Sequence, residues 1–264
     1  MDRTTYLDSG TTSGELHTLL SIVIPVYNEE DRLEESVHAI LEFFQHHRIG
    51  GEILVVDDGS EDGTARISDR LSQEFTNVRA IEESHQGKAH AVMSGLRAAS
   101  GAYVGFSDVD LATPLSTWLK CHQALSTGFD VAIASREGKG ATRIGEPWYR
   151  HAMGRVFNLM TRSLLLPGIH DTQCGFKFFT REAMDTILPR CQLYVETSVV
   201  ARPRVTAFDV ELLYIARKQG LRVEVIPVTW TYGAHSKINP VTDTLQNLRD
   251  LLTVRWNGWL GRYG

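Results

Sequence analysis

Cysteine, basic charge and long apolar runs are all scarce in this chain. Its 264 residues include three cysteines, Cys121, Cys174 and Cys191, whose spacing matches neither a metal site nor a redox motif. An odd, sparse count is typical of a reducing cytosol. Lysine and arginine number 27 against 32 aspartate and glutamate residues, for a net charge of −5. Because a nucleic-acid-binding surface needs a basic excess, we expect no nucleic acid partner.

Membrane-crossing and secretion signals are also missing. No apolar run approaches the ~20 residues that span a bilayer, and the N-terminus lacks the basic-then-apolar pattern of a signal peptide. Residues 1–17 are polar and rich in threonine, serine and glycine, and we interpret them as a loose tail. The hydrophobic content of 42% is sufficient for a large domain with its own core. We therefore expect a cytoplasmic protein.

Short apolar segments alternate with helical patterns along the first half of the chain. The expected strands are 19–26, 53–56, 78–81, 103–106 and 131–134, and helical spacing of apolar residues follows each of the first four. This alternation predicts a doubly wound α/β fold with a mostly parallel sheet. Neither a Gly-x-Gly-x-x-Gly run after the first strand nor a phosphate-binding Gly-Lys-Ser/Thr loop is present, which argues against a dinucleotide dehydrogenase and an NTPase.

Two helix starts are expected from capping chemistry. Asn28 is a suitable N-cap, because residues 29–31 place negative charge on the turn that follows. Thr113 is a second N-cap candidate, with Pro114 at the first helical position.

Polar clusters follow the strands of the expected sheet. They are Tyr27-Asn28-Glu29, Asp57-Asp58, Asp108-x-Asp110 and Ser135-Arg136. In open α/β sheets ligands bind beyond the carboxyl ends of the strands, so this shared placement predicts a site.

The aspartates of Asp108-Val109-Asp110 are the most informative of these residues. Two carboxylates two residues apart converge where the chain bends, and such a pair suits a hard divalent cation that carries phosphate oxygens. Asp-x-Asp also occurs by chance, and a solvated loop with an Asx turn is the alternative.

The pattern changes after Arg136. Residues 137–147 are rich in glycine and charge and are interpreted as a loop. The expected elements beyond them are an amphipathic helix over 149–166, a strand over 174–180, a helix over 208–219, a strand over 223–228 and a final helix from Asn239-Pro240 onward.

Several runs resemble glycosyltransferase family 2 in content and order. They are Pro-Val-Tyr-Asn-Glu (25–29), Val-Val-Asp-Asp-Gly-Ser (55–60), Gly-Lys (87–88) and Asp-Val-Asp (108–110). In the second half, Asp-Thr-Gln-Cys-Gly-Phe-Lys (171–177), Phe-Asp-Val-Glu-Leu-Leu (208–213) and Ser-Lys (236–237) resemble the dolichyl-phosphate glucosyltransferase branch and, more loosely, the polyprenyl-phosphate mannosyltransferases. The resemblance implies the nucleotide-sugar-binding fold called GT-A, with helices on the acceptor side.

The resemblance also implies a nucleotide pocket. Its residues would be Pro25, Tyr27, Glu29, Asp58 and Lys88. A carboxylate at a strand end accepts from a base N–H or from ribose hydroxyls, and an aromatic ring packs on the base. Helix capping is the alternative for Glu29, and a turn before a glycine is the alternative for Asp58.

A metal and phosphate site is implied next to this pocket. Asp108 and Asp110 would hold Mg²⁺ or Mn²⁺ against the diphosphate of the sugar nucleotide, and Lys237 would contact the same diphosphate. Arg136 and Arg150 match arginines of the polyprenyl-phosphate enzymes, and guanidinium groups suit phosphate oxygens. A solvated charge at a helix start is the alternative for Arg150.

Other polar residues are left open. Asp209, and then Glu211, are the carboxylates that would act as base if the acceptor were a hydroxyl, with helix capping as the alternative. Gln173 and Lys177 belong to a matching run but are open to a structural interpretation, and His85 has no partner at metal spacing.

The function implied by the resemblance is inverting, metal-dependent transfer of glucose from UDP-glucose to a polyprenyl or dolichyl phosphate. Residues 18–136 would form the nucleotide-sugar-binding half, residues 137–240 the acceptor half of the same domain, and residues 241–264 a C-terminal amphipathic helix. The alternatives are another nucleotide sugar such as GDP-mannose, a soluble sugar or glycan hydroxyl as acceptor, and a binding module without turnover. The intact aspartate pair argues against the last.

Membrane contact is expected at two helices. Residues 149–166 place arginines beside an apolar stripe, and the last helix carries Trp256 and Trp259. Basic amphipathic helices with aromatic residues commonly lie in a membrane interface. We expect weak peripheral contact with the inner face of a membrane, with packing against the protein's own core as the alternative.

Overall fold

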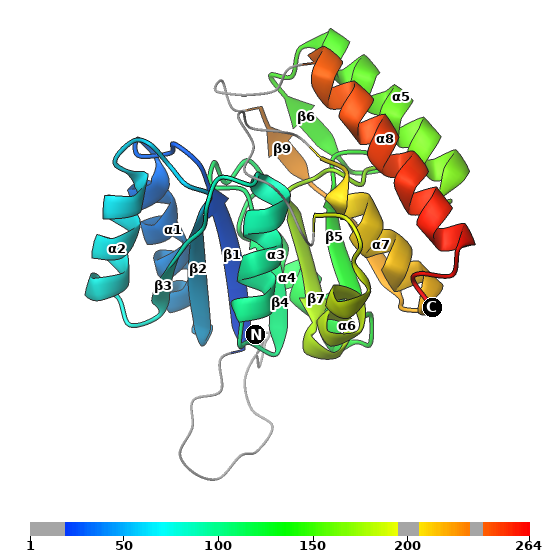
Figure 1. Cartoon of the computed structure of the whole chain (residues 1–264). Helices are drawn as coiled ribbons and strands as arrows, with labels where there is room; N and C mark the ends of the chain where they lie inside the picture. The colour runs from blue at the N-terminus through cyan, green and yellow to red at the C-terminus, as the bar shows by residue number, and fades with distance from the viewer. Residues whose placement is uncertain (1–18, 195–205, 233–239) are drawn as a thin grey trace.

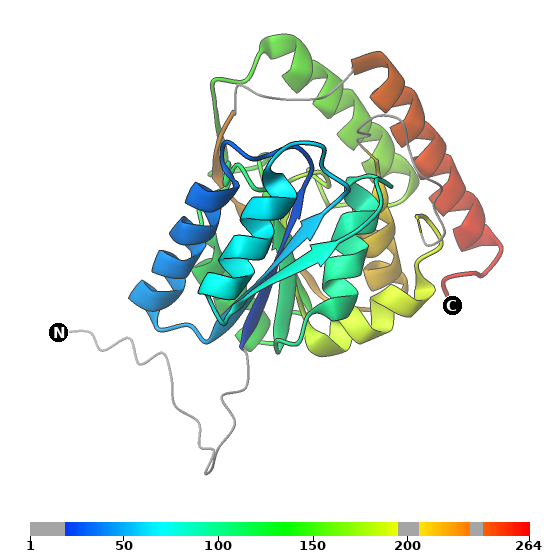
Figure 2. The ribbon, with the colours of Figure 1, turned by 60° about the vertical axis from the view of Figure 1, so that its left-hand side comes forward.

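A seven-stranded sheet lies at the centre of the molecule, with helices on both faces (Figures 1 and 2). The computed structural model describes residues 19–194, 206–232 and 240–264, apart from the side chains of Arg150 and residues 240–245. The strand order is β3-β2-β1-β4-β7-β5-β8. Neighbouring strands pair in parallel except where β7 pairs with β4 and β5.

The strands of this sheet are β1 (Leu20–Val26), β2 (Gly51–Asp57), β3 (Val78–Glu82), β4 (Tyr103–Ser107), β5 (Val131–Ser135), β7 (Phe176–Thr180) and β8 (Val223–Pro227). The α-helices are α1 (Leu33–His47), α2 (Thr64–Glu74), α3 (Lys88–Ala98), α4 (Thr117–Ser126), α5 (Trp148–Leu164), α6 (Arg181–Ile187), α7 (Phe208–Lys218) and α8 (Pro240–Trp259). A separate parallel pair consists of β6 (Thr142–Ile144) and β9 (Thr229–Thr231).

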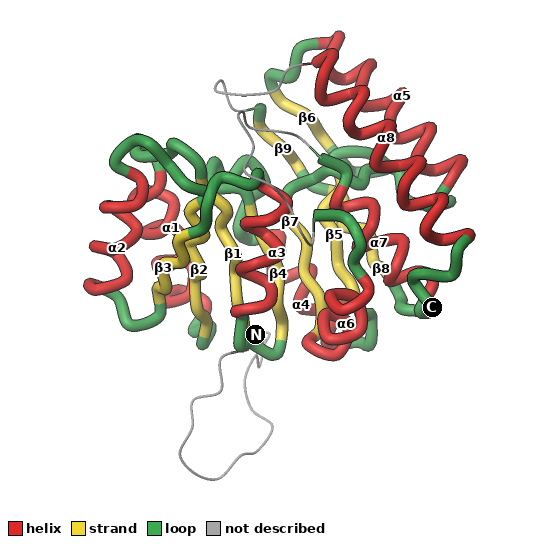
Figure 3. The backbone as a smooth tube through the Cα atoms, in the orientation of Figure 1, coloured by secondary structure: helices red, strands yellow, loops and turns green. Residues whose placement is uncertain are grey.

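The sheet is apolar on both faces, as covered parallel strands are. In β1 the side chains of Ile22 and Ile24 pack on one face and Val23 packs on the other. Helices α1, α2 and α4 cover the first face, and α3, α6 and α7 cover the second. Helices α5 and α8 lie side by side over the outer end of the second layer (Figure 3). The predicted doubly wound, mostly parallel α/β fold is confirmed.

Both predicted helix starts are wrong. Asn28 has φ of 54°, a left-handed conformation that an N-cap does not adopt; its Oδ1 instead accepts the Glu61 N–H at 2.8 Å, and α1 begins at Leu33. Helix α4 begins at Thr117, after a turn closed by the Pro114 carbonyl. A partner 33 positions away thus takes the place of a local cap at Asn28.

The short elements of the second half are absent from the sequence prediction. Strand β6 lies inside the segment that was interpreted as a loop, and β9 and α6 were not expected. Both strands are three residues long and partly exposed, so neither has an apolar pattern to detect.

Among the described residues no helix combines the length and apolar composition that crossing a bilayer requires.

Glu211 ties α7 to two distant segments. Its buried carboxylate accepts the N–H groups of Gln192 and Leu193 at 2.9–3.0 Å and the Tyr263 hydroxyl at 2.7 Å. Burial raises the pKa of Glu211 to about 7, against the opposing effect of these hydrogen bonds.

This raised pKa predicts a pH-dependent stability. Between the ordinary value of 4.5 and about 7, the folded state binds the proton and the unfolded state does not. The free energy of unfolding should therefore fall as pH rises through this window, by about 1–3 kcal/mol from this group. Glu211→Gln keeps the acceptor oxygen and should flatten the slope in urea melts from pH 5 to 8. The same exchange at exposed Glu42 is the control; an unchanged slope in Glu211→Gln contradicts the assignment.

Candidate active site

The carboxyl ends of β1, β2 and β4 meet at one edge of the sheet, because these strands pair in parallel. Tyr27, Asp58 and Asp108 follow these strands directly. Pro25 is buried within β1. The structure therefore brings together residues that the sequence spreads over eighty positions, at the edge where α/β sheets bind ligands.

Asp58 organises the loop that precedes α3. Its buried carboxylate accepts the N–H of Gln86 at 2.8 Å and that of Gly87 at 2.9–3.0 Å, and it lies 2.8 Å from His85 Nδ1. The His85 ring in turn stacks on Tyr27 with ring centroids 4.1 Å apart. Both oxygens of Asp58 therefore hold the loop above the end of β1, a structural task that the sequence did not indicate.

Glu29 lies in the turn that follows β1. Its carboxylate pairs with Arg32 at 3.1 Å, and its backbone N–H donates to Thr64 Oγ1 at 2.8 Å. The turn after β1 is thus tied to the start of α2. Contact of Pro25, Tyr27, Glu29 and Asp58 with a nucleotide stays a prediction.

Lys88 and the two aspartates form the charged centre of the edge. Lys88 is the first residue of α3 and its ammonium pairs with the Asp108 carboxylate. Asp110 accepts the Ala112 N–H at 3.1 Å, and desolvation together with the neighbouring Asp108 charge raises the pKa of Asp110. Two carboxylates that repel each other are therefore held close together beside a lysine.

This donor set fits a hard divalent cation that is shared with a substrate. Among the described residues no group of three or more His, Cys, Asp or Glu side chains gathers as a metal cluster. At this edge the described part of the chain offers the two carboxylates of Asp108 and Asp110, and Mg²⁺ is commonly bound by one or two carboxylates with substrate phosphates completing its shell. A cation there would also relieve the repulsion between the two aspartates.

Gly175, just before β7, fits closely against Asp108. Its carbonyl accepts the Asp108 N–H at 3.1 Å. A Cβ added at Gly175 would lie 2.1 Å from Asp108 Oδ2 and 2.5 Å from Oδ1. Only glycine lets the second half of the chain approach the aspartate this closely.

A buried ion pair lies beneath the charged centre. Lys177 of β7 is fully buried and its Nζ lies 3.1 Å from Asp209 Oδ2, at the first turn of α7. Burial raises the pKa of Asp209 despite the attraction of Lys177 and of Lys88. Asp209 Oδ1 has no hydrogen-bond partner among the described residues. Asp209, the candidate base for a hydroxyl acceptor, is therefore already paired with Lys177.

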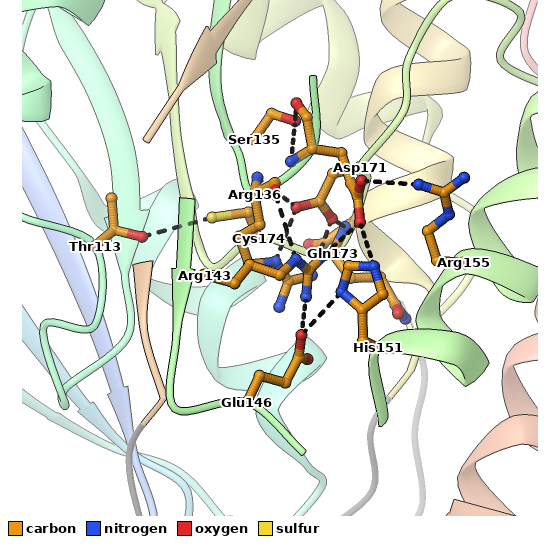
Figure 4. A network of polar contacts seen from close by, with 12 residues as sticks. Thr113, Ser135, Arg136, Arg143, Glu146, His151, Arg155, Asp171, Gln173 and Cys174 are labelled. Atoms are coloured by element: carbon orange, nitrogen blue, oxygen red, sulfur yellow. Dashed lines mark hydrogen bonds and ion pairs between the residues drawn. The ribbon is translucent and has the colours of Figure 1, made fainter. Parts of the chain in front are cut away.

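Arg136 is held by Asp171 in the network of Figure 4. Its Nε and Nη2 donate to the two Asp171 oxygens at 2.8 and 2.9 Å, and its backbone N–H donates at 2.8 Å. Burial alone would raise the pKa of Asp171, but Arg136 outweighs this effect and holds that pKa well below its usual range. The guanidinium also lies 5.3 Å from the centre of the Trp230 ring. Arg136 is thus fixed in place.

Further charged residues extend this network toward α5. Arg143 donates to Glu146 at 2.7 Å and to Glu137 at 3.0 Å (Figure 4). Gln173 Nε2 is buried without a partner among the described residues. The sequence assigned no role to Arg143, and Asp171 was visible only as part of a matching run.

The structure does not describe the side chains of two predicted site residues. Lys237 lies outside the described residues, and so does the side chain of Arg150, although its backbone belongs to α5.

Solved structures share this fold. Mannosyl-3-phosphoglycerate synthase from Rubrobacter xylanophilus has a TM-score of 0.65 at 17% identity, over 93% of this chain and 76% of that one. Glucosyl-3-phosphoglycerate synthase from Mycobacterium tuberculosis, solved with Mn²⁺, UDP and phosphoglyceric acid, has a TM-score of 0.59 at 21% identity, over 98% and 85%. The fold is that of the GT-A glycosyltransferases, as the sequence resemblance implied.

The family follows from sequence comparison. The profile of glycosyl transferase family 2 matches residues 21–188, and the chain belongs to that family. Dolichyl-phosphate beta-glucosyltransferase from Homo sapiens is 33% identical over 251 residues, which cover 89% of this chain and 74% of the relative. The enzyme of the same name from Dictyostelium discoideum is 29% identical over 256 residues, covering 92% and 75%. The chain is a glycosyltransferase, and the predicted resemblance to this branch is confirmed.

The contact between Gly175 and Asp108 predicts a sensitive position. Gly175→Ala should push the Asp108 carboxylate away from Asp110, and displacement of a reacting group by about 1 Å costs on the order of 10²-fold in rate. We expect glycosyl transfer to fall by about that factor in a steady-state assay, with secondary structure retained by circular dichroism. Gly154→Ala is the matched control, because a Cβ there meets nothing within 4 Å. Full activity of Gly175→Ala would show that this contact does not position Asp108.

Proposed function

We propose that this enzyme is an inverting glycosyltransferase that moves glucose from UDP-glucose to a polyprenyl phosphate of the dolichyl type. The observation that carries the proposal is the pair Asp108 and Asp110 beside Lys88, at the carboxyl edge of the parallel strands. The dolichyl-phosphate beta-glucosyltransferases among its relatives support the choice of sugar and acceptor.

The donor would lie over the ends of β1, β2 and β4. Tyr27, Glu29 and Asp58 would contact the nucleoside, and Lys88, at the start of α3, would attract the diphosphate. A bound Mg²⁺ or Mn²⁺, held by Asp108 and Asp110, would neutralise negative charge on the leaving diphosphate.

The acceptor would approach from the side of β5 and α5. Arg136 lies at the end of β5 with a fixed guanidinium, and Arg150 belongs to α5. A phosphate oxygen attacks the anomeric carbon as the bond from that carbon to UDP breaks, so the configuration inverts. A phosphate is already an anion at pH 7 and needs no general base. This agrees with an Asp209 whose carboxylate is engaged by Lys177.

Transfer assays test the donor and the acceptor together. We expect glucose to appear on a short polyprenyl phosphate from UDP-glucose with Mg²⁺ or Mn²⁺, and GDP-mannose to be a poorer donor. Asp110→Ala should fold normally but lose transfer by at least about 10²-fold, because the leaving diphosphate loses its stabilisation. It should also lose the metal-dependent rise in Tm with UDP.

Glu61→Ala, at an exposed position of the loop after β2, is the control. Product on a soluble sugar, with none on the lipid phosphate, would replace the proposed acceptor by a hydroxyl. Full activity of Asp110→Ala would remove the metal assignment.

We propose in addition that the outer face of α5 and α8 contacts a membrane surface. Trp148, at the start of α5, is 81% exposed, and near the end of α8 Trp256 is 58% exposed and Trp259 is 70% exposed. Phe157 of α5 and Val254 of α8 point into the core, so each helix packs inward by one face and exposes apolar residues on another. Tryptophan exposed in this way is favoured at a membrane interface, where a lipid phosphate would be found.

Vesicle flotation tests this contact. The wild-type protein should float with anionic vesicles at low salt and less at high salt. Trp256→Ser with Trp259→Ser should reduce the bound fraction by about tenfold or more, since each tryptophan loses apolar burial. Leu119→Ser, on α4 against the opposite face of the sheet, should change nothing. A wild-type protein that stays unbound at low salt contradicts the proposal.

A further inference from the structure

A cavity of about 290 Å³ opens beside α5, and of its lining residues only Glu137 belongs to the network described above. Its polar lining consists of Arg155, Asn158 and Arg162 from α5 with Glu137 and His170 from the adjoining loops. Pockets that hold whole drug-sized ligands run from roughly 300 to 1,000 Å³. The cavity therefore suits a small head group and not a second nucleotide sugar.

The charge that faces this cavity is positive on balance. Glu137 Oε1 is paired with Arg143 at 3.0 Å. Arg155 makes a longer contact, 3.5 Å to Glu137 Oε2, and its side chain is 64% exposed (Figure 4). Arg143 is shared with Glu146 at 2.7 Å and offsets Glu137 in part. Glu137 is the one carboxylate in the lining, beside the two guanidinium groups of Arg155 and Arg162. The lining is therefore able to attract an anion, and guanidinium groups bind phosphate oxygens through two N–H donors.

His170 adds a donor of defined orientation. Arg162 Nη1 donates to His170 Nδ1 at 2.8 Å, so the neutral ring carries its proton on Nε2. Arg162 and His170 are therefore joined by a hydrogen bond, and both can offer N–H groups to a ligand while the imidazole is neutral.

Asn158 indicates what else the ligand must carry. It is 9% exposed, it lines the cavity, and its Oδ1 has no hydrogen-bond partner among the described residues. A buried acceptor without a donor costs about 1–3 kcal/mol. The oxygen is covered in this structure, and a ligand hydroxyl or ammonium would satisfy it once the amide group turns toward the cavity. The lining thus combines donors for an anion with an acceptor for an adjacent hydrogen-bond donor.

The apolar part of the lining places the cavity in relation to the membrane face. Val156 and Leu159 line it, and both are among the exposed apolar residues of α5. The cavity therefore opens at the border between the apolar face and a basic surface. In a bilayer the head-group phosphates lie at that border, next to the hydrocarbon.

We propose that this cavity binds the phosphate diester of a bilayer phospholipid whose head group carries a hydroxyl or ammonium donor, such as a glycerol or ethanolamine head group. Arg155, Arg162 and His170 hold the phosphate, and Asn158 accepts from the head group. The inference rests on the membrane contact proposed above. The site lies outside the reaction and anchors α5 beside the acceptor lipid.

The test keeps the net charge constant, because general attraction to an anionic surface depends on charge alone. Arg162→Lys preserves the charge but loses the planar fork and the bond to His170. It should weaken binding to vesicles of phosphatidylcholine and phosphatidylglycerol by about tenfold, the effect of one lost charge-assisted hydrogen bond. His170→Gln, measured at pH 8, should weaken it in the same direction. Arg255→Lys on α8 is the matched control and should bind like the wild type.

A second arm separates a lipid head group from free phosphate. Inorganic phosphate and glycerol 3-phosphate are titrated into each variant by calorimetry, and transfer to a short polyprenyl phosphate in detergent is measured in parallel. A loss in Arg162→Lys on vesicles, with transfer in detergent unchanged, supports the proposal. A loss confined to inorganic phosphate overturns the lipid assignment in favour of a free-phosphate site.

Two results overturn the site itself. Equal vesicle binding by Arg162→Lys and Arg255→Lys would show that attraction is general. A wild-type protein that binds no vesicles would remove both the site and the membrane contact. Neither result touches the donor and acceptor assignment, because the detergent assay needs no bilayer.

Discussion

The antiparallel strand β7 is the constraint on which the active site depends. It lies between β4 and β5 and pairs with both, so the second half of the chain enters the sheet of the first. Gly175 thereby packs against Asp108, and Lys177 reaches Asp209 from the middle of the sheet. A one-residue slip in register would turn every β7 side chain to the opposite face of the sheet. The register of β7 therefore determines both the pairing of the sheet and the positions of Gly175 and Lys177.

The charges around this strand are organised as internal pairs. Lys88 pairs with Asp108, Lys177 with Asp209, and Arg136 with Asp171. Buried charges are tolerated when they are paired and hydrogen-bonded, so the protein can hold cations and carboxylates at a fixed geometry where the sugar nucleotide is proposed to bind. Binding at such a site requires little rearrangement, since the dipoles and charges are oriented before the substrate arrives.

Much of the fold was open to prediction because its signals are local. Buried strands such as β1 and β4 are continuous apolar runs, and the expected helical spacing after the first four strands corresponds to α1–α4. The wrong helix start at Asn28 has a physical origin. Asn28 binds the distant Glu61 backbone in place of a local N–H. A hydrogen bond across 33 positions is not visible in the spacing of a single segment, and short exposed strands such as β6 have no apolar pattern either.

The sequence by itself determined the class of fold, the family and the edge of the sheet where the site lies. Hydrophobic periodicity and the placement of polar residues after strands are properties of the chain in order. Only the tertiary structure decided the task of each charge there: Asp58 holds the loop of His85, Asp171 holds Arg136, and Lys177 occupies Asp209. These partners are 27, 35 and 32 positions apart. The choice of partner is made by the packing of the whole sheet, because two side chains interact only when the fold brings their atoms within a few ångströms.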